Sequence, residues 1–227
     1  MLEGSRTVGE ALAGGHVPTV VIVPESADVD PVLRDLPSST EVLVVRDKAF
    51  ARLAPAVTPQ PMLALVPRPV AVVPEPLGPD AVVLVLAGVS DPGNVGTLIR
   101  VADAVGTSVV VAVGGADPWG PKVVRSSAGA VLRVPVVMRD SIEAALAELR
   151  AAGAKIVATD VREGEPHDGG ALTAPVAIVL GSEPRGLDRS IDPLVDAWIR
   201  IDMPGNAESL NVAMAGTLLA YEARRTR

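Results

Sequence analysis

Side chains that could bind an anion lie where a buried apolar segment gives way to a helix, in Val89–Arg100 (VSDPGNVGTLIR). Asn94 can cap the helix that begins there, and Gly96 lets another backbone or a ligand come close. The free N–H groups and the dipole of such a helix start favour negatively charged ligands. Arg100, on the second turn, could bind a phosphate, although a surface ion pair with Asp103 is the default interpretation of a lone helical arginine.

The glycines of this segment fit neither of two common nucleotide motifs. The P-loop requires Gly-x4-Gly-Lys-Ser/Thr, whereas Gly88 and Gly93 are followed by Asn94-Val95. The dinucleotide pattern G-x-G-x-x-G is absent as well. The missing dinucleotide pattern argues against a nucleotide-dependent oxidoreductase with a doubly wound sheet.

A second candidate loop lies in Val179–Leu187 (VLGSEPRGL). A buried strand ends there at Gly181, and the following loop presents Ser182, Glu183 and Arg185. Loops at the carboxyl ends of parallel strands are where such sheets bind ligands. A plain turn is an interpretation of equal weight.

The third candidate segment is Ile201–Arg225 (IDMPGNAESLNVAMAGTLLAYEARR). A Pro-Gly-Asn loop leads to a long apolar helix, and Ser209 at its start can cap free N–H groups. Asn211 is polar where the helical pattern favours an apolar residue. Strand, loop and helix together predict a small-molecule pocket, and ordinary capping of a core helix is the alternative.

Two groups of cationic residues could contact phosphates. Lys122 and Arg125 are three residues apart in a predicted helix, so both could face one phosphate group. Arg46, Lys48 and Arg52 are the best such cluster in the first 68 residues. In each case a packing or solvated helix face is a comparable interpretation.

Alternating strands and helices predict two α/β units, residues 1–68 and 80–227, joined by a linker at 69–79. Residues 67–80 carry five prolines, which lack an N–H donor and fix φ, so they predict an extended linker. In the first unit we expect strands at 17–24, 41–46 and 62–66 and helices at 5–13, 30–36 and 47–53. In the second we expect strands at 81–87, 108–113, 131–137, 154–159, 176–180 and 198–203, with helices at 95–105, 121–130, 141–152 and from 209 onward. The strands of the second unit are apolar throughout, which favours a mostly parallel sheet covered on both faces.

Composition excludes several classes of site. The net charge of −7 argues against a broadly basic nucleic-acid binder, and the aromatic content of 2% makes base stacking improbable. With no cysteine and two histidines, we expect no metal site. No apolar run reaches the roughly 18 residues of a membrane span, and the first residues do not resemble a signal peptide, so we expect a cytoplasmic protein.

Taken together, four segments resemble the SpoU (TrmH-type) RNA 2′-O-ribose methyltransferases of the SPOUT superfamily. They are DPGNVGTLIRVADAVG, PKVVRSSAGA, LGSEPRGL and IDMPGNAESLNVAMAGTLLAYEARR, in this order and spacing. The resemblance covers residues 80–225. The first unit is similar to the L30e-like substrate domain of the rRNA-modifying branch, through EGSRTVGEAL and Thr58-Pro59-Gln60.

This resemblance implies a methyltransferase domain with a C-terminal trefoil knot, S-adenosylmethionine (AdoMet) as cofactor, and a homodimer that acts on RNA, with rRNA favoured over tRNA. The catalytic residues it implies are Asn94, Arg100, Glu183, Ser209 and Asn211. The AdoMet-binding residues it implies are Leu180, Gly181, Ile201, Met203, Ser209, Leu210 and Asn211. The candidate RNA contacts are Arg6, Arg46, Lys48, Arg52, Lys122 and Arg125.

Three departures from the family pattern bear on these expectations. Pro184 follows Glu183 where a small residue is common, and Asp202 stands where a proline is common. The family also implies a basic helix and strand before EGSR, and a short N-terminus would explain part of the acidic balance. A tRNA methyltransferase and a non-catalytic RNA-binding relative are the alternatives, and the sequence does not separate housekeeping modification from antibiotic resistance.

Overall fold

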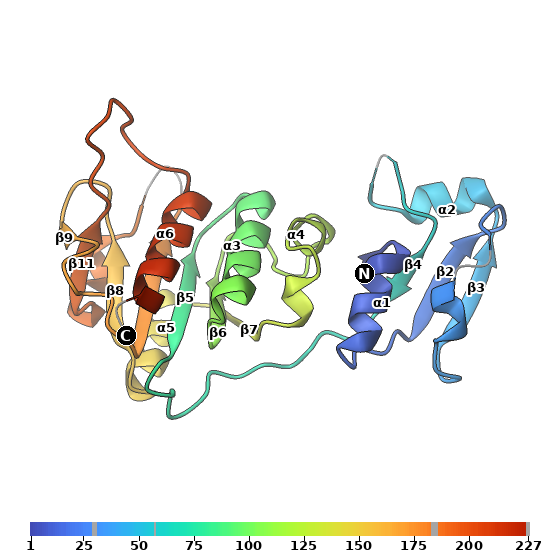
Figure 1. The fold of residues 1–227 in the computed structure, drawn as a ribbon, viewed down its shortest axis with the longest axis horizontal. Coiled ribbons are helices and arrows are strands. Elements are labelled where there is room, and N and C mark those ends of the chain that lie inside the picture. Colours follow the sequence, from blue (N-terminus) through green and yellow to red (C-terminus); the bar gives the residue numbers. More distant parts are fainter. Residues whose placement is uncertain (29–30, 57, 183–185, 226–227) are drawn as a thin grey trace.

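A computed structural model describes residues 1–28, 31–56, 58–182 and 186–225. It contains two β-sheets, one in the first 65 residues and one after residue 81. Figure 1 shows the two units side by side, with an extended segment running beneath them. The mixed α/β architecture predicted from the sequence is confirmed. Every helix within the described ranges is too short or too polar to cross a membrane.

The N-terminal module is a four-stranded sheet in the order β1-β4-β2-β3. β2 and β3 are parallel, and β4 runs antiparallel to both of its neighbours. Its elements are β1 (Leu2–Glu3), α1 (Ser5–Ala13), β2 (Val20–Pro24), the 3-10 turn η1 (Pro31–Arg34), β3 (Glu41–Val45), α2 (Asp47–Leu53) and β4 (Leu63–Leu65). The helices at 5–13 and 47–53 lie where the sequence predicted them.

The second unit is a seven-stranded sheet in the order β7-β6-β5-β10-β8-β11-β9, and all its strand pairs are parallel. The strands are β5 (Val82–Ala87), β6 (Val109–Val113), β7 (Val136–Arg139), β8 (Lys155–Thr159), β9 (Glu165–Pro166), β10 (Val176–Gly181) and β11 (Ala197–Arg200). The helices are α3 (Pro92–Val105), α4 (Pro121–Ser126), α5 (Ile142–Ala151) and α6 (Val212–Arg225), with 3-10 turns η2 (Ala130–Leu132) and η3 (Arg189–Leu194).

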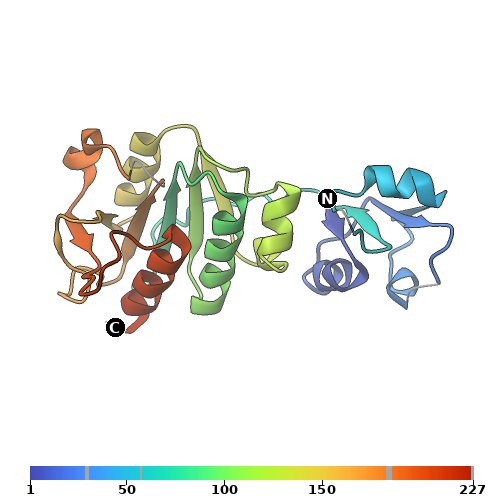
Figure 2. The same ribbon diagram turned by 90° about the horizontal axis from the view of Figure 1, so that it is seen from above.

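Alternation along the strands explains why this sheet is covered on both faces. In β5, Leu84 and Leu86 pack into one buried cluster, whereas Val83 and Val85 pack into the other. The first cluster holds the buried faces of α3, α4 and α6, and the second holds that of α5. Figure 2, seen from above, shows α3 and α6 on one side of the sheet and α5 on the other.

One predicted strand was placed too early. The sequence predicted a strand at 131–137, but residues 130–132 form a 3-10 turn and β7 begins at Val136. The chain reverses just before, because Ala128 and Gly129 both have positive φ, 49° and 78°. This turn also ends α4 at Ser126 rather than at residue 130. Apolar composition alone gave no sign of such a reversal.

The proline-rich linker is extended, as predicted, but its second half is packed. Residues 66–81, all within the described ranges, form no helix or strand. Val70 is 96% exposed, whereas Val73 and Leu77 are buried in the cluster that covers α5. The N–H of Leu77 also donates to the carbonyl of Ala152. The domain boundaries themselves stay a prediction.

Candidate functional site

A cavity of about 670 Å³ lies at the carboxyl ends of three adjacent strands, β10, β8 and β11. The loop that leads from β11 into α6 forms much of its wall. Parallel sheets bind ligands at such strand ends. All seven residues predicted to bind the cofactor line this one cavity: Leu180, Gly181, Ile201, Met203, Ser209, Leu210 and Asn211.

Close backbone packing shapes the wall at Gly181. A Cβ atom placed on Gly181 would lie 2.6 Å from the carbonyl carbon of Gly186. Gly186 is itself held there, because its N–H donates to the carbonyl of Ser182 at 2.8 Å. Gly181 therefore lets two backbone segments meet at the cavity, and any side chain would push them apart.

Asn211 joins the cavity to the start of α3. Its Oδ1 accepts hydrogen bonds from the N–H groups of Ala213 and Met214, at 2.9 and 3.3 Å, so it caps α6. Its Nδ2 donates to Oδ1 of Asn94 at 3.0 Å. This amide is therefore fixed in one orientation by contacts on both ends. Two residues 117 positions apart in the sequence therefore meet beside the cavity.

The capping predictions for Ser209 and Asn94 were wrong. α6 begins at Val212, and the residue that caps it is Asn211, so Ser209 is exposed in the loop and lines the cavity. At α3, the side chain of Asp91 accepts from the N–H of Asn94 at 2.9 Å and is the cap. Serine, asparagine and aspartate are all good helix caps, so the sequence alone could not show which of the neighbouring polar residues caps each helix.

The loop after β8 is a cavity wall that the sequence analysis missed. Thr159, Asp160, Val161 and Arg162 all line the cavity. Asp160 organises this loop by accepting hydrogen bonds from the N–H groups of Arg162 and Glu163, at 2.8 and 2.9 Å. The signal that could have revealed it was the predicted strand at 154–159, whose carboxyl end faces the same edge of the sheet.

Arg189 holds the loop after β8 in place through ion pairs with two of its carboxylates. It donates to Asp160 at 3.0 Å and to Glu163 at 2.8 Å, and its guanidinium stacks 3.8 Å from the centre of the Trp198 ring. Burial acts to raise the pKa of Asp160, but the backbone N–H donors of Arg162 and Glu163 and the charge of Arg189 hold that pKa below its ordinary value. The carboxylate is therefore charged at neutral pH.

Acid should weaken this loop only at low pH. Because the folded-state pKa of Asp160 is below the ordinary 3.8, its contribution to stability is complete above that value and is lost as the pH falls through the folded pKa. We expect Asp160→Asn to be less stable than the wild type by a difference that is constant above about pH 5 and shrinks below about pH 4. Urea unfolding of both proteins at several pH values measures it, and a difference that shrinks already near neutral pH would contradict the assignment.

Arg100 does not share the cavity with Ser209 and Asn211 of the same chain. It is exposed on α3 and does not line the cavity. The ion pair with Asp103 is not formed, since Asp103 pairs with Arg133 at 2.8 Å and Arg100 has no ion pair among the described residues. Glu183, together with Pro184, falls outside the described residues. Asp202 pairs with Arg200 at 2.9 Å and is not part of the cavity wall.

Gly96 serves packing. A Cβ at this position would lie 2.8 Å from the carbonyl oxygen of Val123 and would also overlap the side chain of Ser126, both on α4. The sequence left open whether Gly96 admits another backbone or a ligand. The structure shows the close approach of another backbone, that of α4. Ser126 completes the joint by donating to the carbonyl of Pro92 at 3.1 Å.

We therefore expect Gly96→Ala to lower the free energy of unfolding by about 1–3 kcal/mol, as overpacking does. This sign is opposite to the usual effect of replacing a helical glycine with alanine, which stabilises by about 0.5–1 kcal/mol. Chemical denaturation measures the change. Gly78→Ala is the matched control, because nothing lies within 4 Å of a Cβ at that position. Equal stability of the two variants would contradict a packed α3–α4 joint.

The cationic residues of α2 are free to meet a ligand. Lys48 and Arg52 are one turn apart, on the side of α2 opposite the buried Phe50. Arg46 occupies the N-cap position of the same helix. All three are exposed, and none forms an ion pair within the described ranges. The α2 cluster predicted from the sequence therefore stays available for phosphate contact.

The other predicted RNA contacts are held by carboxylates. Arg6 pairs with Glu10 at 3.1 Å, within α1. Lys122 faces Asp91 at 3.8 Å, whereas Arg125 faces Glu3 at 3.9 Å. Lys122 and Arg125 thus turn toward different segments, and the structure does not support one phosphate shared by both. Within the described ranges, no group of three or more acidic or histidine side chains could hold a metal ion.

Comparison with known proteins identifies a family and relatives that share this sequence pattern and fold. The model of the SpoU rRNA Methylase family matches residues 81–221. Over 225 residues, 99% of this chain and 88% of the relative, the sequence is 32% identical to the 23S rRNA (guanosine(2553)-2′-O)-methyltransferase RlmP of Bacillus subtilis (strain 168).

Two solved structures extend the likeness to the whole chain. The AdoMet-bound rRNA methyltransferase from Sinorhizobium meliloti is 28% identical, with a TM-score of 0.87 over 99% of this chain and 86% of that one. The SpoU methyltransferase AviRb from Streptomyces viridochromogenes, in complex with AdoMet, is 29% identical, with a TM-score of 0.88 over 99% of this chain and 88% of that one. The chain belongs to the SpoU rRNA methylase family.

Proposed function

We propose that this protein transfers a methyl group from AdoMet to the 2′ hydroxyl of a ribose in ribosomal RNA. The observation that carries the proposal is the contact between Asn94 and Asn211 at the edge of the cavity, because it joins two separate family motifs at one ligand-sized space. The family membership and the AdoMet-bound relatives support the same cofactor. An rRNA substrate would place the work of the enzyme in the cytoplasm.

The cavity fits AdoMet in size and chemistry. Its volume lies within the roughly 300–1,000 Å³ of pockets that hold small molecules. Leu180, Ile201, Met203 and Leu210 offer an apolar surface for the adenine, and Asp160 and Ser209 offer polar groups. The loops that line this cavity are those in which the family implies a trefoil knot. When bound, AdoMet supplies a methyl group that its sulfonium already activates.

The protein's own residues would then position and activate the ribose. Oδ1 of Asn94 is occupied by Asn211, so its Nδ2, which has no hydrogen-bond partner among the described residues, can donate to the substrate. The guanidinium of Arg100 is a planar cation that can donate several hydrogen bonds. It would hold a phosphate and stabilise the negative charge that develops on the 2′ oxygen. Glu183 and Ser209 would orient these groups.

We further propose that the enzyme is a homodimer in which Arg100 serves the partner's cavity. α6 presents a stripe of exposed apolar side chains one turn apart, Met214, Leu218 and Tyr221, which are 63%, 49% and 54% exposed. Such a stripe is typical of an interface. α3 packs beside α6 on the same face of the sheet (Figure 2), so an exposed residue of α3 such as Arg100 would lie near this interface. Arg100 does not line the cavity of its own chain, which supports action across the dimer.

Mixing two impaired variants tests this arrangement, at an AdoMet concentration far below the Kd of Gly181→Ala, where that variant is largely inactive. Arg100→Ala leaves the cavity intact, and Gly181→Ala leaves Arg100 intact. If Arg100 acts across the dimer, each mixed dimer has one complete site, and a random mixture should recover about a quarter of wild-type activity. If Arg100 acts within its own chain, the mixture should stay inactive, and the proposed arrangement would be wrong.

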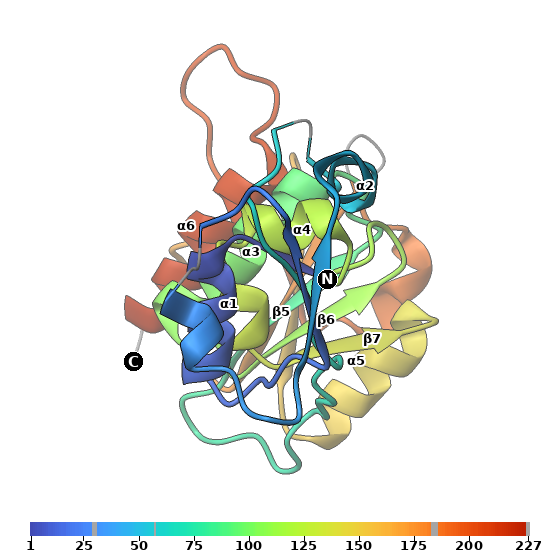
Figure 3. The same cartoon turned by 90° about the vertical axis from the view of Figure 1, so that its right-hand side faces the viewer.

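The RNA would cross the edge of the protein where the cavity opens. Figures 1 and 3 both place α2 at the top, on the same side as the loop before α6. The exposed α2 cluster and the start of α4 therefore lie along one side with the cavity. Since the B. subtilis relative aligns over 99% of the chain, the N-terminal module is shared with an enzyme named for rRNA.

Competition between substrates tests the preference for rRNA. We expect labelled methyl groups from AdoMet to enter unmodified 23S rRNA at least tenfold faster than unmodified tRNA at equal concentration, which corresponds to about 1.4 kcal/mol of discrimination. Preferential labelling of tRNA would overturn the choice of substrate. Binding of AdoMet without transfer to either RNA would favour a non-catalytic RNA-binding relative.

A further inference from the structure

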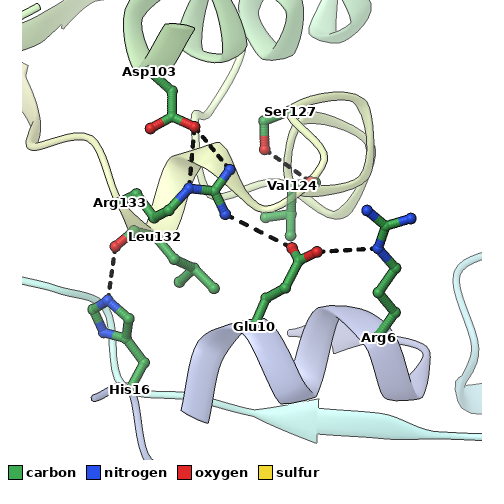
Figure 4. A network of polar contacts seen from close by, with 8 residues as sticks. All are labelled: Arg6, Glu10, His16, Asp103, Val124, Ser127, Leu132 and Arg133. Carbon is green, nitrogen blue, oxygen red and sulfur yellow. Dashed lines mark hydrogen bonds and ion pairs between the residues drawn. The ribbon is translucent and has the colours of Figure 1, made fainter. Parts of the chain in front are cut away.

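A charged side chain links the N-terminal module to the helix that carries the catalytic candidates. Arg133 lies just after η2, at the end of the turn that follows α4. Its Nη1 is 3.7 Å from Oε2 of Glu10 on α1, and its Nη2 is 2.8 Å from Oδ2 of Asp103 on α3. Figure 4 shows Arg133 between these two carboxylates. Glu10 and Asp103 belong to different units, so one guanidinium spans the boundary.

A second polar contact lies beside the first. Nε2 of His16 donates to the carbonyl oxygen of Leu132 at 2.7 Å (Figure 4). The core behind these contacts is continuous, because Val8 and Ala11 of α1 belong to the same buried cluster as Val124 and Ala130. An apolar centre with polar contacts at its rim is typical of a specific interface, here the one between the N-terminal module and the second unit.

The backbone at this interface has an uncommon conformation. Ala128 has a φ of 49°, and Gly129 follows with a φ of 78°. A Cβ atom on Gly129 would lie only 2.8 Å from Oε2 of Glu10. Ala128 is the one non-glycine residue with positive φ among the described residues, and such strain persists only where the surroundings enforce it. The turn is thus shaped to admit the Glu10 carboxylate.

We propose that Glu10 and Arg133 are positioning residues for the RNA substrate. They fix the N-terminal module against α3, so that RNA held by the α2 cluster reaches Asn94 and the cavity at a set distance. This inference rests on the proposed function. It adds to that function the two side chains that set the orientation of the bound RNA relative to the cavity. Ion pairs as exposed as these contribute little to global stability, so their expected effect is on orientation.

Glu10→Gln removes the charge that faces Arg133, together with the ion pair to Arg6, and leaves the Arg133–Asp103 pair intact, so its effect is compared with that of Arg133→Gln. We expect the KM for 23S rRNA to rise about three- to tenfold, because the module no longer presents the RNA in one orientation. The kcat at saturating RNA and the Kd for AdoMet should stay within twofold. Arg133→Gln should raise the KM in the same way, and Arg133→Lys, which keeps the charge, should recover most of the loss.

Glu148→Gln is the matched control. Glu148 pairs with Arg139 at 2.6 Å entirely within the second unit, and its side chain is 35% exposed, compared with 34% for Glu10. This variant should leave the KM for RNA unchanged. An equal rise of KM in Glu10→Gln and Glu148→Gln would assign the effect to general loss of an ion pair and overturn the proposal.

A distance measurement tests the rigid connection without relying on activity. The chain has no cysteine, so spin labels can be attached at Ala51→Cys on α2 and Ala147→Cys on α5, both exposed positions. We expect a narrow distance distribution in the otherwise wild-type protein and a distribution at least twice as broad with Glu10→Gln. Unchanged distributions would overturn the positioning role. A wild-type protein that transfers no methyl group to any RNA would instead overturn the proposed function, and the distributions would still decide whether these contacts fix the module.

Discussion

Replacing Arg100 with alanine should lower the kcat for methyl transfer by about 100- to 1,000-fold, the usual effect of removing one donor that stabilises a developing oxyanion. The Kd for AdoMet should stay within twofold of the wild type, because the proposed role of Arg100 is to hold the RNA phosphate and the 2′ oxygen rather than the cofactor. Single-turnover transfer with saturating enzyme and equilibrium binding of AdoMet measure the two quantities separately.

Arg100→Lys sharpens this prediction. Lysine keeps the positive charge but lacks the planar fork of a guanidinium, so it should recover only part of the loss. Thr97→Ala, an exposed position on the same helix, is the control and should retain near-wild-type activity. Full activity of Arg100→Ala would remove Arg100 from the mechanism and leave Asn94, Glu183, Ser209 and Asn211 as the remaining candidates.

Adding a methyl group at Gly181 should lower the affinity for AdoMet by about tenfold or more. A Cβ there would lie 2.6 Å from backbone of Gly186, and backbone cannot rotate aside as a side chain can. Overpacking of this kind costs about 1–3 kcal/mol, and each 1.4 kcal/mol corresponds to a tenfold change in Kd. The backbone that the new methyl group would displace forms the wall of the cavity. We therefore expect the free-energy cost to appear as weaker binding of AdoMet. Titration calorimetry with AdoMet measures it.

The control for Gly181→Ala is Gly205→Ala. Gly205 lies in the loop between β11 and α6, close in sequence to the cavity wall, and nothing lies within 4 Å of a Cβ built on it. This variant should bind AdoMet as the wild type does. If both glycine variants bind equally well, the close approach at Gly181 does not define the cavity.

The parallel sheet was predictable because its strands are apolar throughout. Such runs mark strands buried on both faces, and the strands predicted at 81–87, 108–113, 154–159 and 176–180 lie within one residue of those observed. The strand at 131–137 was misplaced because Ala128 adopts a positive φ. Alanine rarely does so, and its sequence carries no sign of this conformation.

The cavity residues could be named from the family motifs, but the contacts among them could not. The resemblance led us to Asn94 and Asn211, and the structure shows that one amide caps α6 and also holds the other. The loop at Thr159–Arg162 belongs to none of the quoted motifs, and only the three-dimensional order of β10, β8 and β11 brings it to the cavity. Side-chain pairing across the module boundary, as at Arg133, likewise depends on tertiary packing.

The most direct test of the central claim is the chemical identity of the product. Unmodified 23S rRNA should be incubated with the purified protein and labelled AdoMet, digested to nucleosides, and analysed by mass spectrometry. We predict one 2′-O-methylated nucleoside, with the added mass on the ribose fragment, and alkali resistance of the adjacent phosphodiester at a single site. A methyl group on a base, or no methylated nucleoside despite binding of AdoMet, would contradict the assignment of this cavity to ribose 2′-O-methylation.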